Sequence, residues 1–85
     1  MAGKYSPLFT YLKNLEQHHR EITFTFDQVE RIINDKLPHS AKAHRAWWAN
    51  ENKGGHVQAR EWMGAGWYVD YVDLSRQLVK MIKKH

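Results

Sequence analysis

The possible metal ligands of this chain are six histidines and its carboxylates, since it contains no cysteine. A disulfide, a thiolate nucleophile and a cysteine-ligated zinc are therefore excluded. His39 and His44 are five residues apart, whereas two ligands on one helix face need a spacing of three or four. His18 and His19 are adjacent, and adjacent side chains do not face one another. We therefore expect surface histidines, with no metal and no other cofactor.

Signatures of hydrolytic chemistry are short and incomplete. The serines lack a G-x-S-x-G context, and the pair Gly54-Gly55 is too short for a phosphate-binding loop. Glu51-Asn52-Lys53 matches the acidic-x-Lys fragment of some metal-dependent nucleases, which need a second carboxylate for the metal. Asp35 is the nearest upstream candidate, and it lies at an expected helix end. The sequence favours a protein that is not an enzyme; a nuclease is the catalytic alternative.

Basic side chains are concentrated in the middle of the chain. The formal net charge is +4, and residues 36–60 alone carry +4, from five Lys or Arg and one Glu. Residues 1–35 carry −1 and residues 61–85 carry +1. A basic segment with Trp, Asn and Gln among its charges is typical of nucleic-acid binding, although a solvated protein surface has the same composition.

Segment 40–60 contains the side-chain types that recognise nucleic acids. Arginine binds phosphates and guanine edges, Asn and Gln pair with adenine, and an exposed indole stacks on an unpaired base. If 45–50 is extended, the neighbouring indoles point in opposite directions, one inward and one to the surface. We expect a basic DNA-binding face made by Ser40, Lys42, Arg45, Trp47, Trp48, Asn50, Lys53, His56, Gln58 and Arg60.

A protein-interaction module, such as a small phage or bacterial regulator that inhibits another protein, is the main alternative. An exposed aromatic side chain beside arginine is also typical of protein hot spots. Ion pairs from Arg45 and Arg60 to Glu51 and Glu61 around a flat apolar patch would favour a protein partner. A continuous positive face would favour DNA.

The first half of the chain predicts three helices and a strand. Ser6 is expected to cap a helix over 6–16, with Pro7 at its start. Residues 22–26 alternate as a strand does. Thr25 and Gln28 form a capping-box pattern for a helix over 27–34. Ser40 is expected to cap a short helix over 41–44.

The second half predicts one helix and a hairpin. Residues 45–50 are expected to be extended or irregular, and 50–55 a loop. A helix over 56–63 should stop at Gly64 and Gly66. In the hairpin that follows, Trp67, Val69 and Tyr71 are expected to share one face, and a turn over 73–76 leads into 78–82. Trp62 and Trp67 are expected in the core. As a wing, this hairpin would bring Arg76 and Lys80 near phosphate.

Together these elements predict a single α+β domain over residues 1–85. It would have about four short helices, a small sheet with a C-terminal antiparallel β-hairpin, and a helix-turn-helix or winged-helix-like arrangement. Apolar runs are far shorter than the roughly 20 residues that span a bilayer. The first residues also lack the apolar stretch of a signal peptide. We expect a soluble, cytoplasmic protein with no membrane partner.

Several short motifs occur together along the chain. They are Leu37-Pro38-x-Ser40-Ala41, Arg45-Ala46-Trp47-Trp48-Ala49-Asn50, Gln58-Ala59-Arg60-x-Trp62 and Gly66-Trp67, with Tyr5-Ser6-Pro7-Leu8, Tyr11-Leu12 and Val72-Asp73-Leu74. In these motifs the chain resembles a small prokaryotic and phage domain family of unknown function. The resemblance implies a compact α+β domain that stands alone or is joined to other modules, and it implies no particular activity.

Overall fold

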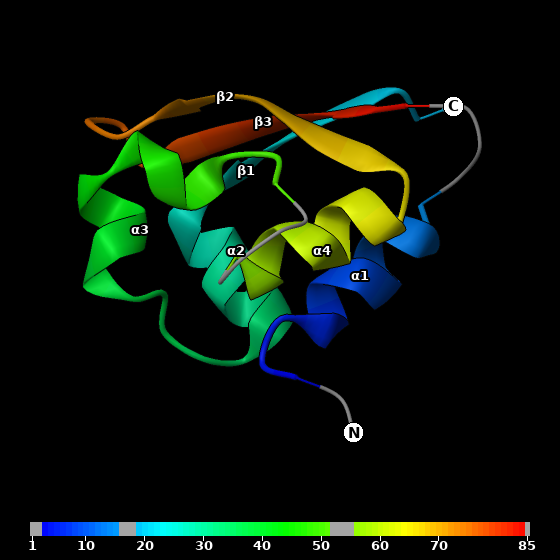
Figure 1. Cartoon of the computed structure of the whole chain (residues 1–85), viewed down its shortest axis with the longest axis horizontal. Helices are drawn as coiled ribbons and strands as arrows, with labels where there is room; N and C mark the ends of the chain where they lie inside the picture. Colours follow the sequence, from blue (N-terminus) through cyan, green and yellow to red (C-terminus); the bar gives the residue numbers. More distant parts are fainter. Residues whose placement is uncertain (1–2, 16–18, 52–55, 85) are drawn as a thin grey trace.

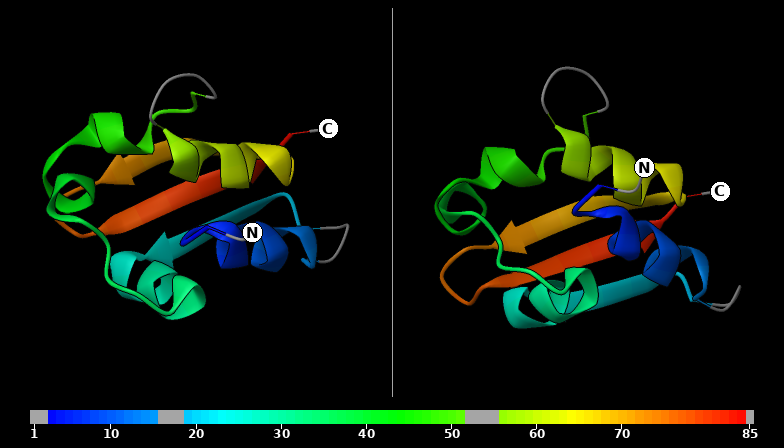
Figure 2. Two further views of the ribbon diagram at one scale, coloured as in Figure 1. Left: turned by 60° about the horizontal axis from the view of Figure 1, so that its bottom comes forward. Right: turned by 90° about the horizontal axis from the view of Figure 1, so that it is seen from below.

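A three-stranded antiparallel sheet forms one layer of the protein, and the α-helices cover one of its faces (Figures 1 and 2). The computed structural model describes residues 3–15, 19–51 and 56–84. The strands are β1 (Glu21–Thr25), β2 (Trp67–Asp73) and β3 (Leu78–Lys83). Their order in the sheet is β1-β3-β2, and both pairings are antiparallel. The predicted α+β class and C-terminal β-hairpin are confirmed.

The helices of the described residues are short. They are α1 (Ser6–Lys13), α2 (Phe26–Ile33), α3 (His39–Ala43) and α4 (Val57–Gly64), with a single-turn 3₁₀ helix, η1 (Arg45–Trp48), between the last two. The α1 helix ends three residues before the predicted boundary. The α2 helix follows β1 with no connecting residue.

The N-termini of three helices test the predicted caps. At α2, Thr25 Oγ1 accepts from Gln28 N, and Gln28 Oε1 accepts from Thr25 N, as the capping-box pattern predicts. The caps predicted at Ser6 and Ser40 are wrong. The N-cap residues are Tyr5 and Pro38, so each serine lies inside its helix and makes no side-chain capping bond.

Glu30 fixes the segment between α2 and α3. Its Oε2 accepts a hydrogen bond from Leu37 N at 2.8 Å and lies 3.4 Å from Lys42 Nζ. The hydrogen bond from Leu37 is the largest cause that lowers the pKa of Glu30, and Lys42 lowers it further against the opposing effect of burial. A single carboxylate therefore connects α2 to the backbone and to α3.

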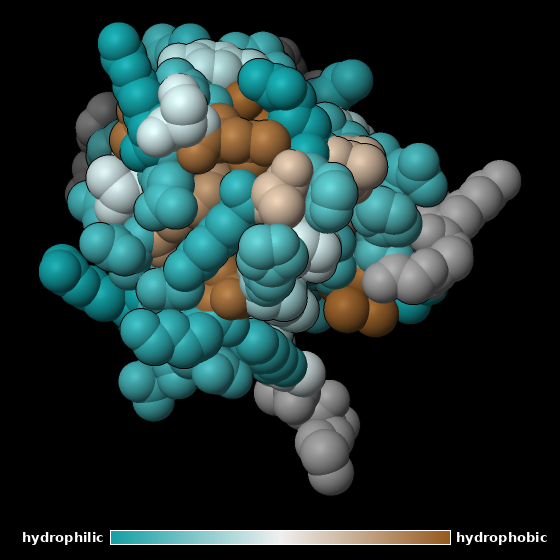
Figure 3. All heavy atoms as spheres, turned by 90° about the vertical axis from the view of Figure 1, so that its left-hand side faces the viewer, coloured by the Kyte–Doolittle hydropathy of each residue, from teal (hydrophilic) through white to brown (hydrophobic). Residues whose placement is uncertain are grey.

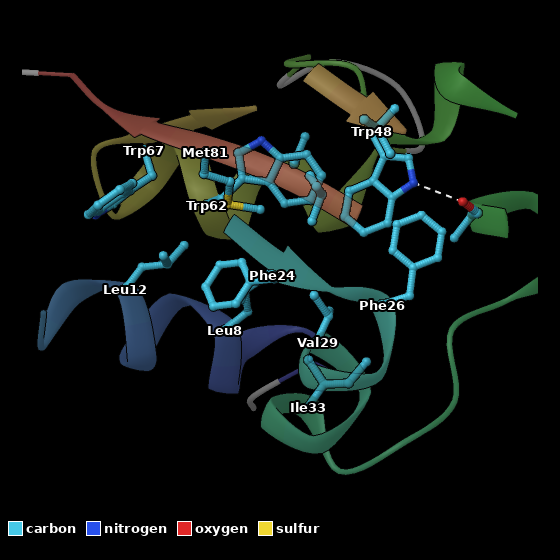
Figure 4. Close-up of a cluster of buried hydrophobic side chains, with 14 of the residues drawn as sticks. Leu8, Leu12, Phe24, Phe26, Val29, Ile33, Trp48, Trp62, Trp67 and Met81 are labelled. Atoms are coloured by element: carbon cyan, nitrogen blue, oxygen red, sulfur yellow. Dashed lines mark hydrogen bonds between the residues drawn. The ribbon is translucent and has the colours of Figure 1, made fainter. Parts of the chain in front are cut away.

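Bulky aromatic residues fill the space between the sheet and the helices (Figure 4). Trp62 and Trp67 are fully buried, as predicted, and so is Phe26. Trp48 stacks between Phe26 and Trp62, with ring centroids 5.1 and 5.9 Å away. Its indole Nε1 donates to the Ala41 carbonyl at 2.8 Å, which ties α3 to the core.

The hairpin differs from the predicted alternation at Asp70. The register pairs Val69 with Met81 but Tyr71 with Lys80, so one extra residue is accommodated in β2. After this bulge the inward position passes to Val72, and Tyr71 lies exposed on the other face. The prediction that Tyr71 shares a face with Trp67 and Val69 is therefore wrong.

Candidate nucleic-acid interface

The described parts of segment 40–60, residues 40–51 and 56–60, lie on one side of the molecule, beside β2. In both views of Figure 2, α3, η1 and α4 succeed one another along this side, and β1 lies at the opposite edge of the sheet. Both η1 and α4 pack against β2. Arg45 and Arg60 are exposed on η1 and α4, respectively. The fold thus places two predicted phosphate-binding residues on one side; we call this side, with its elements α3, η1 and α4, the β2 side.

The two adjacent tryptophans lie in a 3₁₀ helix, so the prediction of an extended or irregular segment is wrong for residues 45–48. Trp48 is only 2% exposed. Trp47 is half-buried and packs edge-on against Trp48 at 4.7 Å and Tyr5 at 5.7 Å between ring centroids. Both indoles therefore belong to one aromatic cluster, and neither projects freely as a platform for a base.

Asn50 is bound to β2 through its side chain. Its Nδ2 donates to the Val69 carbonyl at 2.9 Å, and its Oδ1 accepts from Val69 N at 2.8 Å. The same oxygen accepts from Trp62 Nε1 at 3.0 Å. These bonds occupy the donor and acceptor pair with which an asparagine reads adenine. Asn50 therefore has a structural role beneath the candidate interface.

Gln58 also lies inside the protein. It is 5% exposed, and its Nε2 donates to the Trp47 carbonyl at 2.8 Å. This bond links α4 to η1. Trp48, Asn50 and Gln58 together form an internal support beneath the exposed residues of this side.

The basic residues of the predicted set have different surroundings. Arg45 forms no ion pair with any residue that the structure describes. Arg60 lines a hollow of about 310 Å³ with Met63, Gly64 and Tyr68. Lys42 is half-buried and its Nζ lies 3.4 Å from the Glu30 carboxylate.

Two further predicted positions, Ser40 and His56, are half-buried and offer less to the candidate interface, and a third lies outside the described residues. Ser40 is half-buried within α3. His56 is half-buried at the start of α4, and its Nδ1 has no hydrogen-bond partner among the described residues. Lys53 lies outside the described residues. Of the fragment Glu51-Asn52-Lys53, Glu51 alone is described.

The β2–β3 turn and α3 lie at the same end of the molecule, and the turn carries one exposed arginine (Figure 1). Arg76 is 78% exposed there, and its Nε lies 3.9 Å from Asp73 Oδ2. Lys80, the other expected phosphate contact, pairs with Glu21 at 2.7 Å and Asp70 at 3.8 Å. The hydrogen bond to Glu21 is the main cause that raises the pKa of Lys80. Lys80 is thus neutralised by its neighbours.

Two exposed histidines lie at the ends of α3, His39 as its first residue and His44 as its C-cap, and would add to a basic face at this end. Figure 3 views the same end, where hydrophilic side chains surround a small apolar area. Both lie in the basic middle of the sequence, and histidine is a side chain that can add positive charge below neutral pH.

A search of the described ranges finds no group of three or more His, Asp or Glu placed to hold a metal ion. None of the helices that the structure describes has the length and apolar character needed to cross a membrane.

The chain matches a known protein family. A family model described as "Domain of unknown function (DUF7662)" matches residues 5–84. No curated protein and no solved structure matches the chain.

Proposed function

Because the chain belongs to the DUF7662 family of domains of unknown function, we propose a function from its own surface: it is a non-enzymatic domain that binds DNA through the β2 side. The observation that carries this proposal is the pair of exposed arginines, Arg45 and Arg60, on successive elements of that side. Arginine is well suited to phosphate because its planar guanidinium donates two parallel hydrogen bonds.

The internal support described above explains how this face keeps its shape. Trp48 ties η1 to α3, Gln58 ties α4 to η1, and Asn50 ties the segment after η1 to β2. The backbone on which the arginines stand is therefore held at several points. A rigid arrangement of cations lowers the entropy lost when they bind successive phosphates.

The exposed face of α4 has a composition that suits close approach to DNA. Val57, Arg60 and Gly64 are spaced by three and four residues and are all exposed, whereas Ala59 and Trp62 point into the core. Gly64 has no side chain and Val57 a short one, which leaves the helix surface beside the arginine accessible to a groove. In helix-turn-helix domains the second helix enters the major groove.

The order of elements is compatible with a winged-helix-like arrangement. A helix and a strand come first, further helices follow, and a hairpin ends the chain, with β1 beside β3. In that arrangement α4 would act as the recognition helix and the β2–β3 turn as the wing, which brings Arg76 toward phosphate. This parallel supports duplex DNA over single strands.

Fluorescence anisotropy with labelled duplex DNA, single-stranded DNA and RNA of equal length tests the proposal. We expect the duplex to bind most tightly, with a dissociation constant of about 1 to 100 µM for a random sequence at physiological salt. Absence of binding to all three would contradict nucleic-acid binding. Tighter binding to RNA or to single strands would contradict the duplex assignment.

A further inference from the structure

The fold protects one edge of the sheet and leaves the other open. At the β2 edge, Asn50 occupies the N–H and C=O of Val69, and the bulge at Asp70 interrupts the strand beside it. Natural sheets protect exposed edges with such devices, because unpaired backbone groups are a template for another strand. At the β1 edge, on the far side of the sheet, no described residue forms an equivalent clamp at the centre of the strand (Figure 2).

Two hydrogen bonds show which backbone groups of β1 face this open edge. Lys83 N donates to the Arg20 carbonyl, and Phe26 N donates to the Gln77 carbonyl, both at 2.8 Å. Arg20 and Phe26 therefore direct these groups toward β3. Successive residues of a strand alternate in direction in an antiparallel pair. The odd-numbered residues of β1, with Thr23 at their centre, thus direct their N–H and C=O groups outward.

Thr23 is the position at which a further strand could pair. The N–H of Thr25 already donates to Gln28 Oε1 at 2.8 Å, so that end of β1 is capped. The N–H and C=O of Thr23 point away from β3 and so make no bond in the sheet ladder. They have no other hydrogen-bond partner among the described residues. One residue of this kind offers a donor and an acceptor to an added strand.

A pocket of about 240 Å³ lies directly beside this position. Its apolar lining comes from α1, β1 and α2, and comprises Tyr11, Ile22, Phe24 and Ile32. Tyr11 is 41% exposed at the pocket and packs edge-on against Phe24. The volume is below the roughly 300 to 1,000 Å³ typical of small-molecule sites, and it suits one amino-acid side chain.

The charge at the pocket favours an acidic occupant. Arg31 is the charged residue of the lining, and it forms no ion pair with any described residue. Glu21, on the same strand edge, is held by Lys80 at 2.7 Å. Asp27, Glu30 and Asp35 line the adjacent hollow with Arg31 but form no ion pair with it, so its guanidinium can pair with a carboxylate of the incoming segment.

We propose that the β1 edge binds an extended segment of a partner protein by strand addition. The segment pairs with the N–H and C=O of Thr23, inserts an aliphatic side chain between α1 and α2, and places a carboxylate at Arg31. This site is separate from the β2 side and does not depend on DNA binding.

Selection of a displayed library of random heptapeptides on the full chain tests this inference, followed by titration of the enriched peptide in synthetic form. Thr23→Pro removes the outward N–H, and proline is tolerated on edge strands because that N–H makes no ladder bond. Arg31→Glu reverses the charge at the pocket. Lys36→Glu makes the same charge change outside the pocket lining and is the matched control.

We expect enriched peptides that combine an aliphatic and an acidic residue in a β-prone stretch. Thr23→Pro and Arg31→Glu should each weaken binding about ten-fold, as expected for one lost hydrogen bond or charge pair, with Lys36→Glu within two-fold. Amide exchange at Thr23 should slow when the peptide binds. If thermal unfolding shows that Thr23→Pro is not folded, a peptide N-methylated at its central residues tests the same hydrogen bonds by removing the donors of the peptide. This peptide should bind wild type about ten-fold more weakly than the unmethylated peptide.

Four outcomes would overturn the proposal. In the first, the library yields no binder. In the second, the enriched peptide binds wild type and Thr23→Pro equally, or N-methylation leaves its affinity unchanged. In the third, the chemical-shift changes that the peptide causes in the protein fall on segment 40–60. Sedimentation of the free chain as a dimer with a protected Thr23 amide would assign the edge to a second copy instead and would also overturn it.

Discussion

Asn50 pairs with Val69 as a residue of a neighbouring strand would. One side-chain amide donates to the Val69 carbonyl at 2.9 Å and accepts from the Val69 N–H at 2.8 Å, so it replaces a backbone partner at the β2 edge. The carbonyl oxygen of the same amide also receives the Trp62 indole at 3.0 Å. A side chain expected to read a base therefore joins the sheet, the core and the segment that carries Arg45.

Asn50→Ala should lower the free energy of unfolding by about 2 kcal/mol. It removes three hydrogen bonds and leaves the groups of Val69 and Trp62 without their partner. Urea denaturation followed by tryptophan fluorescence measures the change. Asn14→Ala is the control, because Asn14 is exposed and its side chain makes no hydrogen bond with a described residue, so a change within about 0.5 kcal/mol is expected. Equal stability of wild type and Asn50→Ala would show that the clamp has no structural role.

Trp48→Phe should cost about 3 kcal/mol of stability. The smaller ring leaves a cavity, and the buried Ala41 carbonyl loses the indole donor that lies 2.8 Å away. Trp67→Phe is the matched control, since Trp67 is equally buried but its Nε1 has no hydrogen-bond partner among the described residues. We expect a cost smaller by about 1 to 2 kcal/mol in the same denaturation experiment. Equal costs would mean that the bond to Ala41 contributes nothing.

Glu30 should make the protein sensitive to acid. Because the folded state lowers the pKa of Glu30, its contribution to stability is complete above the ordinary glutamate value of about 4.3 and is lost as the pH falls through the lower folded value. Glu30→Gln should therefore be less stable than wild type at pH 7, and the difference should shrink below pH 4. Denaturation midpoints at several pH values measure this.

Glu51→Gln provides the reference for that series, because Glu51 is exposed and forms no ion pair with a described residue. Its stability at pH 7 should lie within about 0.5 kcal/mol of wild type. A gap between Glu30→Gln and wild type that stays constant from pH 7 to pH 3 would refute the linkage.

Local patterns predicted the elements whose signals are complete within a few residues. The Thr25–Gln28 capping box is one such case, because both partners lie within one helical turn. Gly66 is another: its φ of 90° beyond the end of α4 is a conformation that glycine adopts without strain. The buried Trp62 and Trp67 followed from the need of a small domain for large core side chains.

Features that depend on contacts between distant residues were not predictable in this way. The bulge at Asp70 is defined by the pairing of β2 with β3, and the alternation of apolar and polar residues along β2 does not indicate it. The roles of Asn50 and Gln58 were misjudged for the same reason, since their partners lie 19 and 11 residues away. Their side-chain chemistry fits base recognition and internal support equally, and only burial and bonding separate the two.

The salt dependence of duplex binding by Arg45→Ala/Arg60→Ala tests the central claim most directly. Each phosphate contact contributes about 0.9 to the slope of log K against log salt concentration, so the double variant should have a slope shallower by about 2 and weaker binding at low salt. The control Lys13→Ala/Arg20→Ala removes the same charge from two exposed residues outside segment 40–60. We predict a wild-type slope for the control. Equal slopes for the two double variants would contradict a DNA interface on the β2 side.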